Sequence, residues 1–275
     1  MDRKSVREIF LAKSAFLFDG EKAREELLQK WNGCNFLVCE EELSGNIHTG
    51  GHHGFLSKGI AERIYDSFPD AEIVIFIRNQ PDIIASVYKQ YVSMGGTHLP
   101  HRYLHHPGVK PHRQPVFNFD HFKYWNLINY YLELFGREQI HVFPYEKFVK
   151  DKDCFLQQFQ KELNLEVDLS RVNISKHENP SYSPQLLPLA RFLNKFTVRD
   201  VHHKMTWVHI PGAYQITRKV LSLLNSYWVQ RESKDGRTTI LDREDLALIS
   251  NYYRSSNERL NKELHLDLDE QNYPL

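Results

Sequence analysis

The chain has 275 residues, of which 41% are hydrophobic and 25% are charged. This composition excludes a disordered chain, a collagen and a disulfide-rich scaffold. Its 35 Lys and Arg residues balance 35 Asp and Glu residues, so the chain has no overall positive field that would attract nucleic acid or an anionic membrane. Any anion must therefore be held by a local group of residues. The length of the chain predicts one large domain over residues 1–275.

The N-terminal residues lack the apolar core of a signal peptide, and no run approaches the roughly 18 apolar residues of a membrane span. The cysteines Cys34, Cys39 and Cys154 are odd in number and lack CxxC spacing, so we expect buried, reduced thiols and no zinc site among them. These features predict a cytoplasmic protein.

The first half of the chain alternates helical and strand patterns. Residues 4–31 predict two short helices, and residues 35–38 predict a buried strand that ends at the acidic run Glu40 to Glu42. A helix is expected over residues 58–67, and the five consecutive apolar residues 73–77 predict a central strand of a parallel sheet.

A second strand is predicted at residues 140–143, and the chain from about residue 183 onward has helical periodicity. The predicted fold is therefore a three-layer α/β protein with a parallel sheet of four or five strands and a helix-rich C-terminal half.

Arg78 directly follows the best strand, and Pro81 suits the first turn of a helix behind it. Ligands of open α/β sheets bind at the carboxyl ends of the strands, where a helix N-terminus attracts anions. Ser86 lies about a turn and a half along that helix and can donate its hydroxyl to an oxyanion near Arg78. The plainer interpretation pairs Arg78 with a carboxylate such as Asp82.

Four segments resemble the sulfotransferases that use 3′-phosphoadenosine 5′-phosphosulfate (PAPS), in particular the bacterial carbohydrate-type members. The segments are residues 36–45 (FLVCEEELSG), 75–90 (IFIRNQPDIIASVYKQ), 141–148 (HVFPYEKF) and 252–274. The resemblance implies a P-loop-type parallel sheet, PAPS as sulfuryl donor and a hydroxylated, carbohydrate-like acceptor. It also implies that Arg78 and Ser86 hold the nucleotide's 3′-phosphate and that Glu41 is the catalytic base. We expect Glu40 and Glu42 to point elsewhere, and the plainer interpretation of all three is a solvated acidic loop.

The chain departs from that family at its start. Family members open with a strand and a Lys-x-Gly-Thr-Thr type loop that holds the 5′-phosphosulfate, whereas no such loop or GxxxxGK[ST] motif occurs here. We expect an N-terminally incomplete domain, or else a complete chain that has lost or replaced the loop. Lys58, Lys89 and Lys176 are candidate cations for the leaving oxygen. The alternative function is a catalytically inactive module that binds a nucleotide or glycan.

Histidines crowd residues 98–112. We expect no imidazole pair on one helix face and no carboxylate nearby, and therefore predict no metal site. His98, Arg102, Tyr103 and Arg113 are instead expected to line an acceptor cleft. A candidate sugar-stacking patch comprises His202, His203, Lys204, Trp207 and His209. Candidates for the far side of the phosphate pocket are Asn173, Ser175, Lys176 and His177.

Overall fold

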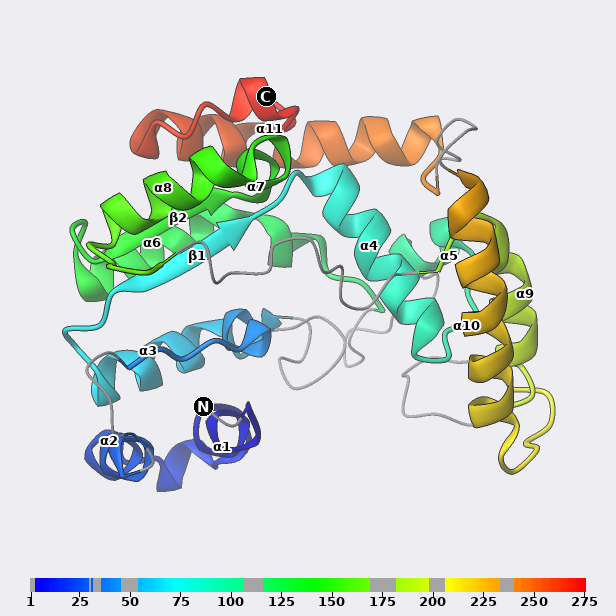
Figure 1. Ribbon diagram of the computed structural model, residues 1–275, viewed down its shortest axis with the longest axis horizontal. Helices are drawn as coiled ribbons and strands as arrows, with labels where there is room; N and C mark the ends of the chain where they lie inside the picture. Colours follow the sequence, from blue (N-terminus) through cyan, green and yellow to red (C-terminus); the bar gives the residue numbers. More distant parts are fainter. Residues whose placement is uncertain are drawn as a thin grey trace. The chain divides into compact units, whose positions relative to one another are not determined.

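The computed structural model describes residues 3–29, 31, 36–45, 54–105, 116–168, 182–197, 206–232 and 240–275 (Figure 1). The chain divides into two compact units. Unit 1 comprises Met1–Arg78, Asn118–Val167 and Tyr253–Leu275, and unit 2 comprises Asn79–Phe117 and Asp168–Tyr252.

Unit 1 contains a parallel pair of strands, β1 (Ile73–Ile77) and β2 (Ile140–Pro144). Their register sets Ile73 opposite Ile140 and Ile77 opposite Pro144. Both strands were predicted from the sequence, because a continuous run of β-branched and aromatic residues favours a buried parallel strand. β1 is less buried than a central strand should be, since Ile77 is its single fully buried residue.

The described part of the chain contains two strands rather than the four or five predicted. Residues 36–38 form no strand, and the side chain of Leu37 is 77% exposed. The apolar side chains on either side of it, Phe36 and Val38, pack instead on the helical cluster built around Val6, Phe10 and Leu27. Burial of these two side chains therefore stabilises the packing of the N-terminal helices and not a sheet.

Helices surround the two strands of unit 1. They are α1 (Arg3–Arg7), α2 (Gly20–Leu28), α3 (Ser57–Ser67), α6 (Tyr124–Phe135), α7 (Tyr145–Lys150), α8 (Lys152–Glu162) and residues 253–264 of α11 (Arg243–Leu264). One face of the sheet presents Phe76 and Phe143, whose ring centroids lie 5.2 to 6.2 Å from those of Phe155 and Phe159 on α8. Helix α6 contacts β2 and packs on α3. Unit 1 is thus a small α/β layer structure.

Unit 2 is helical. Its elements are α4 (Gln80–Ser93), α5 (Pro100–Leu104), α9 (Leu187–Asn194), α10 (Ala213–Glu232) and residues 243–252 of α11. Its core contains the rings of Tyr88, Tyr91 and Tyr103, which are 0 to 1% exposed and have centroids 4.7 to 6.2 Å apart. The hydroxyls of two of these tyrosines are satisfied by backbone groups at residues 97 and 98, as burial of a polar group requires.

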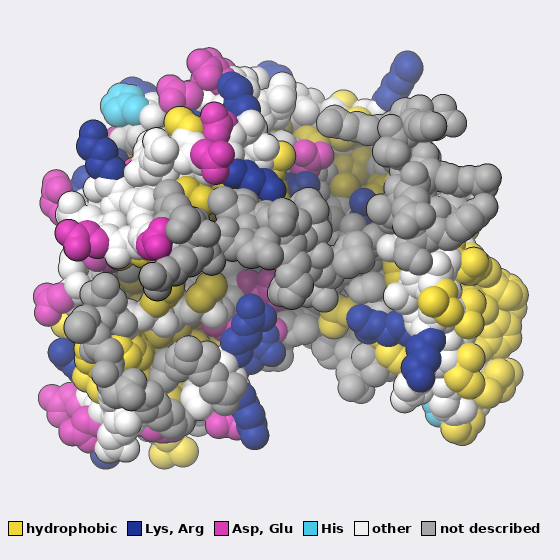
Figure 2. Space-filling model, viewed as in Figure 1, with side chains coloured by type: hydrophobic (Ala, Val, Ile, Leu, Met, Phe, Trp, Pro, Cys, Tyr) yellow, Lys and Arg dark blue, Asp and Glu magenta, His cyan; other side chains and the backbone are white. Residues whose placement is uncertain are grey.

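Unit 2 also carries an exposed apolar face. Ile216, Val220, Leu223 and Leu224 of α10 are 36 to 73% exposed and lie on one side of the helix. Figure 2 shows hydrophobic side chains gathered over α9 and α10. No described helix combines the length and the hydropathy that are needed to cross a bilayer.

Candidate functional site

Arg78 lies at the carboxyl end of β1, where its backbone is fixed by a tyrosine from α6. The hydroxyl of Tyr124 donates to the Arg78 carbonyl oxygen at 2.6 Å and accepts from the Arg78 N–H at 3.4 Å. Burial raises the pKa of Tyr124, so this hydroxyl stays protonated and continues to donate. The arginine therefore projects from an anchored strand end.

The guanidinium group of Arg78 stacks on an aromatic ring from the neighbouring strand end. Its central carbon lies 5.3 Å from the ring centroid of Tyr145, the first residue of α7 after β2. Stacking of this kind orients a guanidinium without neutralising its charge. Within the described residues of unit 1, no carboxylate forms an ion pair with Arg78. A half-buried cation in this state is suited to binding an anion.

Glu146 follows Tyr145 at the same edge of the sheet, and its carboxylate accepts a hydrogen bond from the hydroxyl of Tyr273 at 3.0 Å. Burial, and then the negative charge of Glu146, raise the pKa of Tyr273. The C-terminal segment thus supplies a hydrogen-bond donor to the carboxylate of Glu146. The sequence indicated the segment around residue 145 but not this role of Tyr273.

Ser86 is half-buried on α4 in unit 2. The start of α4 differs from the expectation, because Asn79 caps it: the Asn79 side-chain oxygen accepts from the Asp82 N–H at 3.0 Å and its amide donates to the Asp82 carboxylate at 3.2 Å. One N–H that was expected to face an anion is therefore already used. The pairing of Ser86 with Arg78, a residue of unit 1, stays a prediction.

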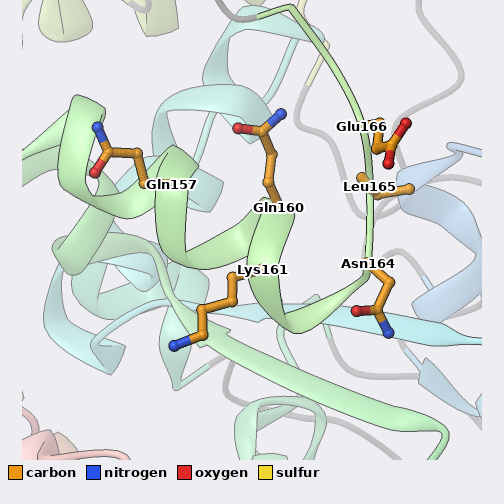
Figure 3. Close-up of a pocket in the computed structure, with 6 residues that line it drawn as sticks. All are labelled: Gln157, Gln160, Lys161, Asn164, Leu165 and Glu166. Atoms are coloured by element: carbon orange, nitrogen blue, oxygen red, sulfur yellow. The ribbon is translucent and has the colours of Figure 1, made fainter.

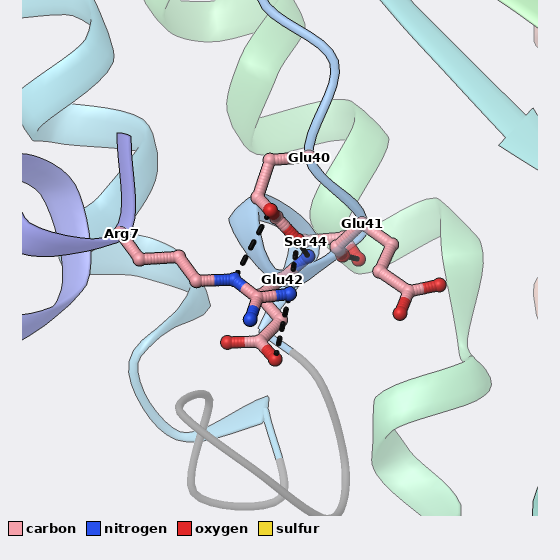
Figure 4. A network of polar contacts seen from close by, with 5 residues as sticks. All are labelled: Arg7, Glu40, Glu41, Glu42 and Ser44. Carbon is pink, nitrogen blue, oxygen red and sulfur yellow. Dashed lines mark hydrogen bonds and ion pairs between the residues drawn. The ribbon is translucent and has the colours of Figure 1, made fainter. Parts of the chain in front are cut away.

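Glu41 begins a 3₁₀ turn, Glu41–Ser44, and its neighbours are both tied to one arginine (Figure 4). Arg7 donates from Nε and Nη2 to the two carboxylate oxygens of Glu40 at 3.1 and 3.0 Å, and its Nη2 lies 3.4 Å from a carboxylate oxygen of Glu42. The side chain of Glu40 is 1% exposed. A bidentate guanidinium contact is the strongest way to hold such a buried carboxylate.

Glu41 itself is exposed, and its side chain points away from this network (Figure 4). Its carboxylate forms no hydrogen bond or ion pair with any described residue. Glu40 and Glu42 do point elsewhere, as predicted, but their partner was not predicted because Arg7 lies 33 positions before Glu40. Glu41 is therefore the one of the three carboxylates that is available to a ligand.

The other candidate residues fall into different surroundings. Lys58 lies over the ring of Tyr130 at 5.1 Å, Lys89 is half-buried on α4, and Lys176 lies outside the described residues. The expectation that His98 and Tyr103 line an acceptor cleft is wrong, since they are 6% and 0% exposed in the core of unit 2. Their apolar ring surface is used for packing.

Several remaining candidates lie outside the described residues. These are Arg113, Asn173, Ser175, Lys176, His177, His202, His203 and Lys204. Trp207 is 57% exposed, and the ammonium of Lys195 lies 4.4 Å from its ring centroid. Cys39 and Cys154 are exposed free thiols, so the expectation of buried cysteines is wrong for these two. Cys34 is also outside the described residues.

A pocket of about 500 Å³ lies at the end of α8 (Figure 3). Its lining residues are Gln157, Gln160, Lys161, Asn164, Leu165 and Glu166. This lining includes none of the predicted site residues and offers mainly amide groups. The candidate site is therefore taken to be the carboxyl ends of β1 and β2, where Arg78 and Tyr145 meet, and not this pocket.

No protein-family model matches the chain, and no curated protein matches it. Among solved structures, the chain is similar to the crystal structure of a sulfotransferase from Alicyclobacillus acidocaldarius, with a TM-score of 0.46 and 20% sequence identity. The match covers 79% of this chain. The chain spans 65% of the length of that sulfotransferase.

Proposed function

We propose that this chain transfers a sulfuryl group from PAPS to a hydroxyl of a carbohydrate-like acceptor. The observation that carries the proposal is the state of Arg78: an anchored, ring-stacked guanidinium at the carboxyl end of β1, without a carboxylate partner among the described residues of its unit. A guanidinium in this state binds phosphate by charge-assisted, bidentate hydrogen bonds. It occupies the position that the sequence resemblance gives to the 3′-phosphate ligand.

In this proposal Arg78 and Ser86 hold the 3′-phosphate of the nucleotide. The guanidinium carbon of Arg78 lies 5.3 Å from the ring centroid of Tyr145, which supports the assignment. This stacking restricts the arginine to few rotamers, so its side chain loses less conformational entropy when a phosphate binds. Ser86 supplies a neutral hydroxyl donor, which completes a phosphate contact without adding charge.

Glu41 is the proposed base. It removes the proton of the acceptor hydroxyl while the acceptor oxygen attacks sulfur and the bond from sulfur to the bridging phosphate oxygen breaks. The products are the sulfated acceptor and adenosine 3′,5′-bisphosphate. The exposure of Glu41 supports this role, and so does Arg7, which neutralises much of the charge of Glu40 and Glu42 beside it.

Transfer of labelled sulfate from PAPS to a panel of mono- and oligosaccharides tests the proposal. We expect transfer by the wild-type chain and a loss of about 100- to 10,000-fold in Glu41→Gln, the range over which general bases contribute. Glu25→Gln, a change at an exposed glutamate of α2 in the same unit, serves as the matched control and should retain full activity.

The outcomes separate the two candidate functions. Transfer that survives in Glu41→Gln would remove the base assignment. Binding of adenosine 3′,5′-bisphosphate without any transfer would favour an inactive nucleotide-binding module, the alternative indicated by a sequence without the phosphosulfate loop motif. A folded protein that neither binds nor transfers would contradict both.

A further inference from the structure

We propose that His101, His105 and Asp245 of unit 2 bind a divalent transition-metal ion, with zinc as the best-suited ion. No metal site was predicted from the sequence, because neither a helical imidazole pair nor a nearby carboxylate was expected in the histidine-rich stretch. The structure supplies both. The nitrogen and oxygen atoms that the three side chains offer all lie within 4.8 Å of one another.

Helix α5 (Pro100–Leu104) brings the two imidazoles together. The His105 N–H donates to the His101 carbonyl oxygen at 2.8 Å, which closes one helical turn. Residues separated by four positions share a helix face, and the two ring centroids are accordingly 4.8 Å apart. This is the spacing with which helices present paired histidine ligands to zinc.

The carboxylate comes from the first turn of α11. The Asp242 side chain accepts a hydrogen bond from the Asp245 N–H at 2.8 Å, which fixes the backbone of this turn. The Asp245 side chain is 2% exposed, and its Oδ1 lies 3.6 Å from His101 Nδ1 and 3.3 Å from His105 Nε2. These two imidazoles are the partners of that carboxylate among the described residues. A buried carboxylate with so little compensation favours an added cation.

The two distances from Asp245 Oδ1 suit a shared metal ion better than a pair of hydrogen bonds. A separation of 3.6 Å is too long for a hydrogen bond, and 3.3 Å is a weak one. Ligand atoms that surround a zinc ion tetrahedrally at about 2.0 to 2.1 Å stand roughly 3.3 to 3.4 Å apart. Two imidazole nitrogens and one carboxylate oxygen are also a donor set that zinc uses, with a fourth position left open for water.

An ion can reach these ligands from solvent. The side chains of His101 and His105 are 69% and 29% exposed, whereas Asp245 forms the buried floor. A bound ion would join α5 to the first turn of α11, segments that are 140 positions apart in the sequence between His105 and Asp245. It would therefore stabilise unit 2 as well as provide an open coordination position.

Calorimetric titration of the metal-free chain with zinc chloride tests the proposal, together with His101→Ala, His105→Ala and Asp245→Asn. We expect one site in the wild type that weakens by more than about 100-fold in each variant, which exceeds the effect of losing an outer-shell partner. His141→Ala is the matched control, because His141 also stands between two carboxylates, those of Glu72 and Glu162 in unit 1, yet does not belong to this cluster.

Cobalt substitution in the wild-type chain gives a second readout that needs no variant to fold. We expect the intense visible absorption of a four- or five-coordinate ion with nitrogen ligands, and its loss in Asp245→Asn. Failure of the wild type to bind zinc, equal zinc affinity in folded variants, or the weak spectrum of six-coordinate cobalt would overturn the proposal. None of these results depends on Arg78 or on sulfuryl transfer.

Discussion

Two carboxylates, Glu40 in unit 1 and Asp245 in unit 2, are buried to a similar degree but have different partners. Glu40 is 1% exposed and is held by the Arg7 guanidinium through two contacts of 3.0 and 3.1 Å. Asp245 is 2% exposed and faces two imidazoles at 3.3 and 3.6 Å. The Glu40 carboxylate thus has a permanently charged partner at hydrogen-bond distance, whereas Asp245 has none among its described partners.

The difference shows how a site can be separated from a structural ion pair. A buried charge with a short, permanently charged partner contributes to the fold and has little left to offer a ligand. A charge whose partners are distant or neutral retains the capacity to bind. Arg78, which lies over a ring and has no described carboxylate partner in unit 1, meets this criterion for the proposed anion site. Asp245 is by the same criterion a cation site.

Removing the partner of Glu40 should have the largest effect on stability. We expect Arg7→Ala to lower the free energy of unfolding by about 2 kcal/mol, because it leaves a buried carboxylate without its cation, and the partial exposure of Arg7 keeps the loss below that of a fully buried pair. Urea denaturation measures this. Lys22→Ala removes an exposed pair with Asp19 and should change nothing measurable, so equal effects of the two variants would refute the comparison.

Asp245→Asn should have a smaller effect in the metal-free chain. We expect a loss of about 1 kcal/mol, since the asparagine keeps its volume and gives up two weak contacts. The same urea titration in the presence of a chelator measures it, and added zinc should widen the difference from the wild type. A loss as large as that of Arg7→Ala without metal would mean that the imidazoles alone hold the carboxylate firmly.

A pH effect is expected from the tyrosine core of unit 2. Burial raises the pKa of Tyr88 to about 12, so the native state keeps a proton that the unfolded chain loses near pH 10. Stability from this group is therefore full below pH 10 and is lost as the pH rises toward about 12. Unfolding curves across this range should show a shallower decline in Tyr88→Phe. An identical decline in both proteins would assign it to other groups.

The smallest stability change is expected at Glu41. Because its carboxylate has no partner among the described residues, Glu41→Gln should alter the free energy of unfolding by less than about 0.5 kcal/mol. A thermal melt compared with that of Arg7→Ala would show the contrast within one acidic run. A large loss in Glu41→Gln would give this residue a structural role and weaken its assignment as a base.

The elements that were predicted correctly are those with strong local patterns. The apolar run at β1 and the proline at the start of α4 specify structure within a few residues. The strand expected at residues 35–38 was wrong because a short apolar run does not reveal whether it packs on strands or on helices. Here Phe36 packs on Phe68 and on the helical cluster of unit 1.

The features that escaped prediction depend on contacts between distant segments. Arg7 and Glu40 are 33 positions apart, and His105 and Asp245 are 140 positions apart. The sequence drew attention to Glu40 and to the histidine-rich stretch but not to Arg7 or Asp245, so the charge balance at each site became visible only in three dimensions. The place of Arg78 at the end of a strand was predicted correctly because it is a local property of the sequence.

Binding of adenosine 3′,5′-bisphosphate, measured by titration calorimetry, tests most directly the claim that Arg78 is an anion site for a nucleotide. The account predicts binding by the wild-type chain that is about 10- to 100-fold weaker in Arg78→Ala, the contribution of a charge-assisted contact. Arg259→Ala, which removes another ring-stacked arginine of unit 1, should bind as the wild type does. Equal affinity in Arg78→Ala, or no binding by the folded wild type, would contradict the account.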